Sequence, residues 1–119
     1  MVKKRIWFKT HNDDPKINPS GTSYKGCIKI SYANLVAILG EPSKADGYKV
    51  DAQWTIRFKD KTIATIYNYK TGKNYLGAAG IPTVDIVDWN IGGATQKSVE
   101  KIRKLLGDVA LDIRDDPLR

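Results

Sequence analysis

Histidine and cysteine are nearly absent from this sequence: His11 is the only histidine and Cys27 the only cysteine among 119 residues. Neither a histidine-rich metal site nor a Cys-x-x-Cys site can be built from one of each. A catalytic relay would have to use His11, which lies in a loop where a base is poorly held. We therefore expect no metal and no cofactor, and we find no set of residues arranged for catalysis. Cys27, beside an apolar stretch, is expected to be a small buried residue in a reducing setting.

Long apolar runs are missing as well. No stretch of 18 apolar residues occurs, so no transmembrane helix is predicted. The basic start Met-Val-Lys-Lys-Arg resembles the first part of a signal peptide, but the apolar residues 6–8 that follow are too few for a signal-peptide core. We expect a soluble, cytoplasmic protein without membrane contact.

The charge of the chain is strongly unbalanced, with 20 Lys and Arg against 13 Asp and Glu, a formal net charge of +7. Such an excess on one small domain favours a polyanionic partner, which can be a nucleotide, a nucleic acid or an acidic protein face. The alternative is that the lysines only keep the surface solvated. The basic residues are spread along the chain and residues 112–116 are acidic, so the pattern is not that of a simple nucleic-acid binder.

The strongest structural signal is the segment 52–69, in which two alternating runs are divided by the polar residues 59–61. Alternation with a period of two is typical of a half-buried strand, so the segment predicts an antiparallel hairpin. No glycine is present to supply the positive φ of a tight turn, which favours a slightly longer loop. The first arm places Trp54, Ile56 and Phe58 on the core face and Gln53, Thr55 and Arg57 on the other.

The rest of the chain predicts a single compact domain over residues 1–119. Ser31 is placed to cap a helix over 32–39 that ends at Gly40, and a second helix runs from Thr95 or Ser98 to Gly107. Together with the hairpin, these elements give an α+β fold with a central hairpin in an antiparallel sheet of three to five strands and two helices packed on one face. The other expected elements are strands at 4–9, 27–30, 84–91 and 109–113, an exposed loop at 10–23 and a loose tail at 114–119.

One candidate binding segment is Gly21–Gly26, which offers two glycines, two hydroxyls and an ammonium group. Phosphate oxygens accept hydrogen bonds from all of these, so Thr22, Ser23 and Lys25 are candidate phosphate ligands. The segment lacks the spacing and the helix of a Walker A loop. A purely structural turn is the competing interpretation.

A second candidate segment follows the hairpin and interleaves tyrosines with lysines and asparagines. Bases stack on tyrosine rings in single-strand binders while lysine holds the phosphate. Arg57 is expected on the same outer surface. The competing interpretation is that one tyrosine belongs to the core and the others lie on a loop. The candidate ligands here are Arg57, Tyr67, Asn68, Lys70, Lys73, Asn74 and Tyr75.

Several short motifs together resemble a family of small bacteriophage and prophage accessory proteins. They are GTSxKG from Gly21, LGxP from Leu39, DGYK from Asp46, ATIYN from Ala64, GKNYLG from Gly72 and WxIGG from Trp89, and the likeness covers about 21–107. In that family a glycine often follows the aspartate that corresponds to Asp60, where Lys61 stands here. The resemblance implies a non-catalytic counter-defence protein in the host cytoplasm and assigns no catalytic residue.

Two functions agree with that implication. In the first, a homo-oligomer sequesters a nucleotide-type immune signal, with Thr22, Ser23, Lys25 and the loop 70–75 around its phosphates and bases. In the alternative, the protein inhibits a host defence nuclease by binding it directly, as anti-CRISPR proteins do, or binds the nucleic acid of that nuclease. The first requires the two candidate segments to meet in space.

Overall fold

The computed structural model describes residues 6–44 and 47–116. Lys4 and Arg5 of the predicted first strand and residues 117–119 of the predicted tail lie outside this part of the chain. Residues 45–46 lie outside it as well; they belong to the segment 43–47, whose residue types predict a turn.

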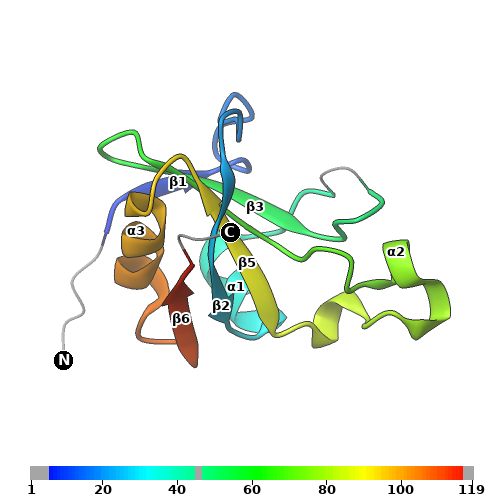
Figure 1. The fold of residues 1–119 in the computed structure, drawn as a ribbon. Coiled ribbons are helices and arrows are strands. Elements are labelled where there is room, and N and C mark those ends of the chain that lie inside the picture. Colours follow the sequence, from blue (N-terminus) through cyan, green and yellow to red (C-terminus); the bar gives the residue numbers. More distant parts are fainter. Residues whose placement is uncertain (1–5, 45–46, 117–119) are drawn as a thin grey trace.

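Six strands form one antiparallel sheet in the order β1-β3-β4-β5-β2-β6 (Figure 1). The predicted α+β class with a central hairpin is confirmed, but the sheet exceeds the expected three to five strands. The reason lies at the edges, where β1 and β6 are only three and four residues long and carry little alternation. The strands are β1 (Phe8–Thr10), β2 (Ser23–Lys29), β3 (Gln53–Phe58), β4 (Ile63–Tyr67), β5 (Asp88–Gly93) and β6 (Asp112–Asp115).

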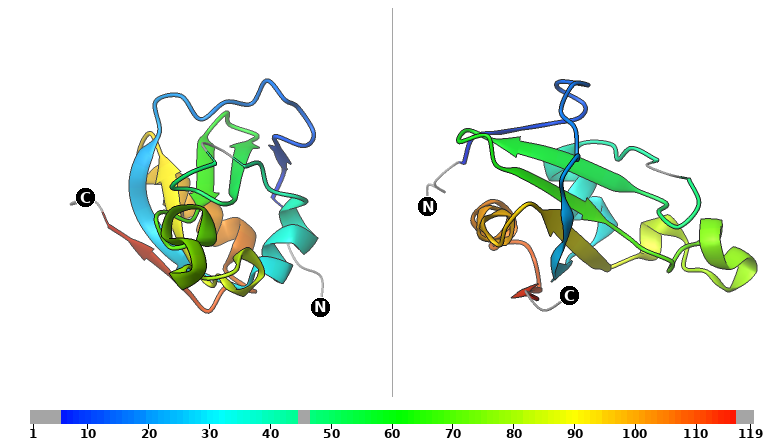
Figure 2. Two further views of the ribbon diagram at one scale, coloured as in Figure 1. Left: turned by 90° about the vertical axis from the view of Figure 1, so that its right-hand side faces the viewer. Right: turned by 45° about the horizontal axis from the view of Figure 1, so that its top comes forward.

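Both predicted helices are present, as α1 (Tyr32–Leu39) and α3 (Lys97–Leu106), and they lie on the same side of the sheet (Figure 2). Ser31 caps α1 as expected, because its side chain accepts a hydrogen bond from the Asn34 N–H at 3.1 Å. The connection from β4 to β5 adds a four-residue helix, α2 (Lys73–Leu76), and two 3-10 turns, η1 (Gly77–Ala79) and η2 (Thr83–Asp85). This connection extends away from the rest of the sheet (Figure 1).

The core lies between the sheet and the two helices and is centred on two tryptophans. Trp54 of β3 and Trp89 of β5 are at most 1% exposed, and their rings meet edge to face at 5.4 Å. Each indole N–H is satisfied, since Trp54 donates to the Gly40 carbonyl at 2.8 Å and Trp89 to the Ile30 carbonyl at 3.0 Å. The predicted core positions Ile56 and Phe58 are buried as well.

The hairpin turn has the longer form that the missing glycine indicates. The Phe58 N–H donates to the Thr62 carbonyl at 2.9 Å and the Lys61 N–H to the Phe58 carbonyl at 2.9 Å, which closes a loop over 59–61. Lys61 itself adopts φ of 72°, the left-handed conformation that glycine usually supplies. Asp60 at the tip accepts a hydrogen bond from Thr62 and contacts the ammonium groups of Lys97 and Lys101 at 3.0 and 3.1 Å; these bonds hold the pKa of its carboxyl well below the ordinary value.

The strained turn makes a stability prediction. Lys61→Gly should raise the free energy of unfolding by about 0.5–1 kcal/mol, because the left-handed conformation costs a residue with a Cβ about 1–2 kcal/mol and glycine avoids this cost. Part of the gain is offset because glycine loses more chain entropy on folding. Urea unfolding of both proteins measures the difference. Lys59→Gly is the control and should destabilise, because Lys59 is not in the left-handed conformation. A Lys61→Gly variant no more stable than the parent would contradict this account of the turn.

The strand predicted over 84–91 begins later than expected. Strand β5 covers Asp88–Gly93, and the chain before it forms η2, so Val84 and Val87 are 68% and 41% exposed instead of lying in the sheet. The strand also continues past position 91, where a glycine pair in the sequence favours an end, and includes Gly92 and Gly93. A side chain at Gly93 would collide with the buried hydroxyl of Ser98, so glycine there allows α3 to approach the sheet closely.

The sheet therefore has two different faces, which we call the helix face and the open face. The helix face carries the buried apolar residues of the core. The open face carries the polar side chains that alternate along the strands with the buried apolar ones. The loop 11–22 crosses part of this face. Two contacts hold this loop on the sheet. The backbone N–H of His11 donates to the Thr55 carbonyl at 3.1 Å, and Asp14 and Arg57 form an ion pair at 3.7 Å. The binding surface must be sought where the loop leaves this face accessible.

Candidate ligand-binding face

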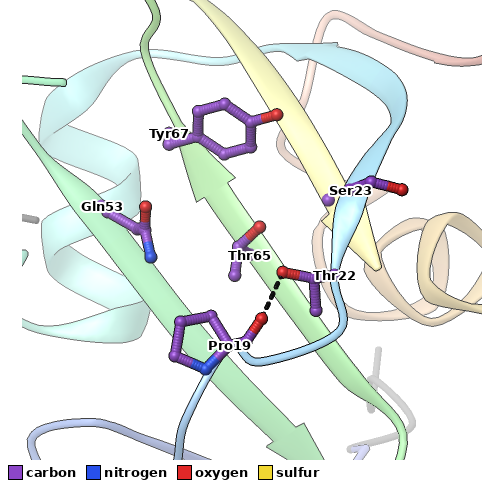
Figure 3. A pocket seen from close by; sticks show the side chains of 7 residues that line it. Pro19, Thr22, Ser23, Gln53, Thr65 and Tyr67 are labelled. Atoms are coloured by element: carbon purple, nitrogen blue, oxygen red, sulfur yellow. Dashed lines mark hydrogen bonds between the residues drawn. The ribbon is translucent and has the colours of Figure 1, made fainter. Parts of the chain in front are cut away.

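A hollow of about 220 Å³, which we call the first hollow, lies between the loop 11–22 and the open face of the sheet. Glycine at position 92 keeps its floor free, because a side chain there would meet the hydroxyl of Thr65. Figure 3 shows that two parts of the chain meet at this hollow, the start of β2 and the hairpin. Its labelled residues are Pro19, Thr22, Ser23, Gln53, Thr65 and Tyr67.

The polar groups of the first hollow differ in how they are used. Thr22 donates its hydroxyl to the Pro19 carbonyl at 2.6 Å, which holds the loop closed (Figure 3). By contrast, the side chains of Gln53, Thr65 and Tyr67 form no hydrogen bond with any part of the chain that the structure describes. Thr65 is only 3% exposed. No side-chain polar atom of the described residues is both buried and unpaired, so these three groups open to the hollow and its solvent. They are the donors and acceptors with which a polar ligand or water can pair there.

Tyr67 presents a neutral phenol to the hollow. Burial raises the pKa of this tyrosine, and the neighbouring Tyr69 raises it further. The hydroxyl therefore keeps its proton at neutral pH and can either donate or accept a hydrogen bond.

Lys25 lies at the rim of the first hollow and does not line it. It occupies an irregularity in the pairing of β2 with β5, between Tyr24 and Gly26, and its ammonium donates to the Ser23 hydroxyl at 2.6 Å. Figure 3 shows the Ser23 side chain directed away from Tyr67 and Thr22. The cation can therefore serve a group that projects from the hollow, but not one inside it.

Asn68 is a structural residue in this fold. It is 1% exposed, and its side-chain oxygen accepts from the backbone N–H groups of Asp51 and Ala52 at 2.8 and 3.1 Å. Its amide nitrogen donates to the Asp51 carboxylate at 2.9 Å, and the other oxygen of that carboxylate accepts from the Asn74 N–H at 3.2 Å. The side chain that we expected to face a ligand instead fixes the loop after β4.

The remaining candidates do not reach the first hollow. Lys70 lies over the rings of Tyr69 and Tyr75 at 5.3 and 5.4 Å, and Tyr75 also contacts the ring of Tyr48 at 5.3 Å. Lys73 and Asn74 are exposed on α2. Arg57 is paired with Asp14 beneath the loop. Of the two candidate segments, the structure joins Thr22, Ser23 and Tyr67, with Lys25 at the rim, while residues 70–75 and Arg57 lie elsewhere.

A second hollow of about 350 Å³ lies on the same face of the sheet. Two ion pairs border it, between Lys29 and Asp88 at 3.3 Å and between Arg114 and Asp112 at 2.6 Å. The bond to Asp112 raises the pKa of Arg114, so this guanidinium stays charged. Cys27 is a free, half-buried thiol at this hollow and not the small buried residue that we expected. The lining residues that matter below are Cys27, Lys29, Tyr69, Thr71, Asn90 and Arg114.

Residue types alone missed Gln53 and Thr65 in the first hollow and Asn90 and Arg114 in the second. The alternation of β3 did place Gln53 on the outer face, and the pairs Gln53↔Tyr67 and Thr55↔Thr65 then place Thr65 beside it. That signal requires the strand register, and the polar residues 59–61 do not determine it because more than one loop length fits them.

Other kinds of site find no support in the described part of the chain. Within residues 6–44 and 47–116, no three side chains of the His, Cys, Asp or Glu type gather where they could hold a metal ion. None of the helices in these two ranges is both long and apolar enough to cross a bilayer. Comparisons with protein-family models, curated proteins and solved structures find no match to this chain.

Proposed function

We propose that this protein is a non-catalytic binding protein for a nucleotide-type ligand, held at the first hollow. The observation that carries the proposal is the group of unpaired polar side chains from Gln53, Thr65 and Tyr67 around one hollow under the loop. A ligand that pairs with all three must offer several closely spaced donors and acceptors. A nucleobase edge and a ribose are built in that way.

The groups around the hollow suit the parts of a nucleotide. The Gln53 amide has both a donor and an acceptor end, as base recognition requires, and the Thr65 hydroxyl can pair with a sugar or a base. The ring of Tyr67 supplies a surface on which a base can stack. Ser23 and Lys25 at the rim then provide a hydroxyl and a cation for a terminal phosphate.

The biological role in this proposal rests on the resemblance to phage accessory proteins. In it the protein acts in the host cell by stoichiometric binding and removes a nucleotide immune signal from solution. A homo-oligomer agrees with such a role, because subunits that pack together can close a shallow site. No catalytic group is needed for sequestration.

A second candidate function is direct inhibition of a host defence nuclease. The observation that favours it is a set of exposed apolar side chains on the connection from β4 to β5, since such surfaces often mark protein contacts. Leu76 and Ile81 are each 44% exposed, and Val84 is 68% exposed. This function predicts a stable complex that co-elutes with the nuclease. Binding to the nucleic acid of that nuclease predicts instead an affinity that falls steeply with salt.

Calorimetry with a panel of cyclic oligonucleotides and NAD-derived nucleotides tests the proposal. At least one is expected to bind, and Thr65→Val should weaken that binding roughly threefold to tenfold, because it removes one hydrogen bond and preserves the shape of the side chain. Thr55→Val is the matched control: Thr55 is the cross-strand neighbour of Thr65 and is also buried, but it does not line the hollow. Absence of binding across the panel, or equal losses in the two variants, would rule the proposal out.

A further inference from the structure

One row of side chains connects the two hollows across the open face. Directly opposed residues on neighbouring strands are Gln53↔Tyr67, Tyr67↔Asn90, Asn90↔Cys27 and Cys27↔Arg114. Opposed residues share one face of a sheet, so all five side chains project from the open face. The row begins in the first hollow with Gln53 and Tyr67 and continues in the second with Asn90, Cys27 and Arg114.

The polar side chains of the row share one feature, a capacity for hydrogen bonds that the described chain does not use. Among the described residues, the side chains of Gln53, Tyr67 and Asn90 have no hydrogen-bond partner. Arg114 uses its Nε for Asp112, which leaves its two terminal nitrogens without a partner in the same part of the chain. Polar groups that could pair with a ligand therefore continue from one hollow into the other.

We infer that the two hollows are halves of one site and that the ligand consists of two nucleotide units joined through phosphate. This inference rests on the proposed function and extends it from the first hollow to Arg114. One unit occupies the first hollow, at Gln53 and Tyr67. The second lies against Tyr69, with the linking phosphate near the terminal nitrogens of Arg114.

The two tyrosines form a repeated platform. Tyr67 and Tyr69 are two residues apart, which in an extended chain places their side chains on one face about 7 Å from each other. Tyr67 lines the first hollow and Tyr69 the second. Each hollow thus has its own aromatic ring on which a base can stack.

Size also favours a ligand of two units. Pockets that hold small molecules usually measure about 300–1,000 Å³, so the first hollow, at about 220 Å³, lies below this range and the second, at about 350 Å³, lies near its lower end. The row from Gln53 to Arg114 crosses from β3 to β6, four strand spacings or about 19 Å. A single nucleotide occupies one hollow, whereas two joined units reach both.

The local charge limits how many phosphates the ligand carries. The two cations of the second hollow, Lys29 and Arg114, are each balanced by a carboxylate, from Asp88 and Asp112. A triphosphate would bring several negative charges next to these carboxylates. A phosphodiester brings one, which the terminal nitrogens of Arg114 can accept with both oxygens. The site therefore favours a dinucleotide over a nucleoside triphosphate.

Calorimetry with the four dinucleotides ApA, GpG, CpC and UpU, their 5′-monophosphates and their 5′-triphosphates tests the inference. At least one dinucleotide should bind tenfold or more tightly than its monophosphate and its triphosphate. Arg114→Gln should remove that advantage, about tenfold, and leave the monophosphate affinity unchanged. Lys104→Gln removes the same charge from an exposed position of α3 and should change neither affinity. Circular dichroism of both variants confirms that the fold is kept.

The outcomes separate the two proposals. A monophosphate that binds as tightly as its dinucleotide, with no effect of Arg114→Gln, would overturn the two-unit ligand and leave the nucleotide site at the first hollow in place, provided that Thr65→Val still weakens it. Equal losses in Arg114→Gln and Lys104→Gln would also overturn the inference, because they would indicate general attraction by charge. Absence of any binding would overturn both proposals.

Discussion

Replacing Trp54 by alanine is expected to lower the free energy of unfolding by about 3–5 kcal/mol. The side chain is completely buried, meets Trp89 edge to face and contacts the ring of Tyr32 at 5.9 Å. Its removal leaves a cavity between the sheet and α1 and deprives the Gly40 carbonyl of its donor. Because a domain of this size is stable by only about 5–15 kcal/mol, this loss removes a large fraction of the stability.

Urea unfolding followed by tryptophan fluorescence measures this loss. Trp7→Ala is the matched control, because the same residue type is 48% exposed there and its removal should change stability by less than about 0.5 kcal/mol. Similar unfolding midpoints for the two variants would show that the packing around Trp54 does not hold the fold together.

The second large effect is expected at Asn68. Alanine at this position leaves the backbone N–H groups of Asp51 and Ala52 without their acceptor and removes a donor from the Asp51 carboxylate. Each buried group left unpaired costs about 1–3 kcal/mol, and water can reach part of the gap, so we expect a total loss of about 2–3 kcal/mol. The loop after β4 should also loosen, because the same carboxylate holds the Asn74 N–H.

Asn74→Ala is the control for this variant. Asn74 has an exposed side chain, and the contact that it makes with Asp51 uses its backbone, so truncation should change stability by less than about 0.5 kcal/mol. Thermal unfolding of both variants separates the roles of the two asparagines. Equal stability of Asn68→Ala and Asn74→Ala would mean that the Asn68 amide is not the structural anchor that its contacts indicate.

The central hairpin and the two longer helices were predictable because each is encoded locally. Alternation in β3, and the cap Ser31 with the terminal Gly40 around α1, determine those elements without knowledge of the rest of the chain. The bounds of the edge strands and of β5 were not predictable, because they depend on hydrogen bonding with neighbouring strands. In the sequence, Gly92 and Gly93 are typical of a strand end. In the structure they lie inside β5, at positions where Thr65 and Ser98 leave no space for a side chain.

The candidate site was predictable only where residue type and position agree. Thr22, Ser23 and Tyr67 were chosen for their chemistry and do meet at one hollow. Asn68 has the same chemistry, but its amide is used inside the fold, which only the tertiary contacts reveal. Arg114 and Asn90 reach the site only through the strand order and register. Strands β5 and β2 lie between β4 and β6 in the sheet, although β2 and β5 are far apart in the sequence.

The most direct test of the central claim, a nucleotide site on the open face of the sheet, is to follow the backbone amide signals by NMR while the tightest-binding dinucleotide is added. The account predicts that the largest shifts fall on the row Gln53, Tyr67, Asn90, Cys27 and Arg114, and on Thr22 and Ser23. Shifts confined to the exposed connection 76–87, or to α3 on the opposite face, would contradict it.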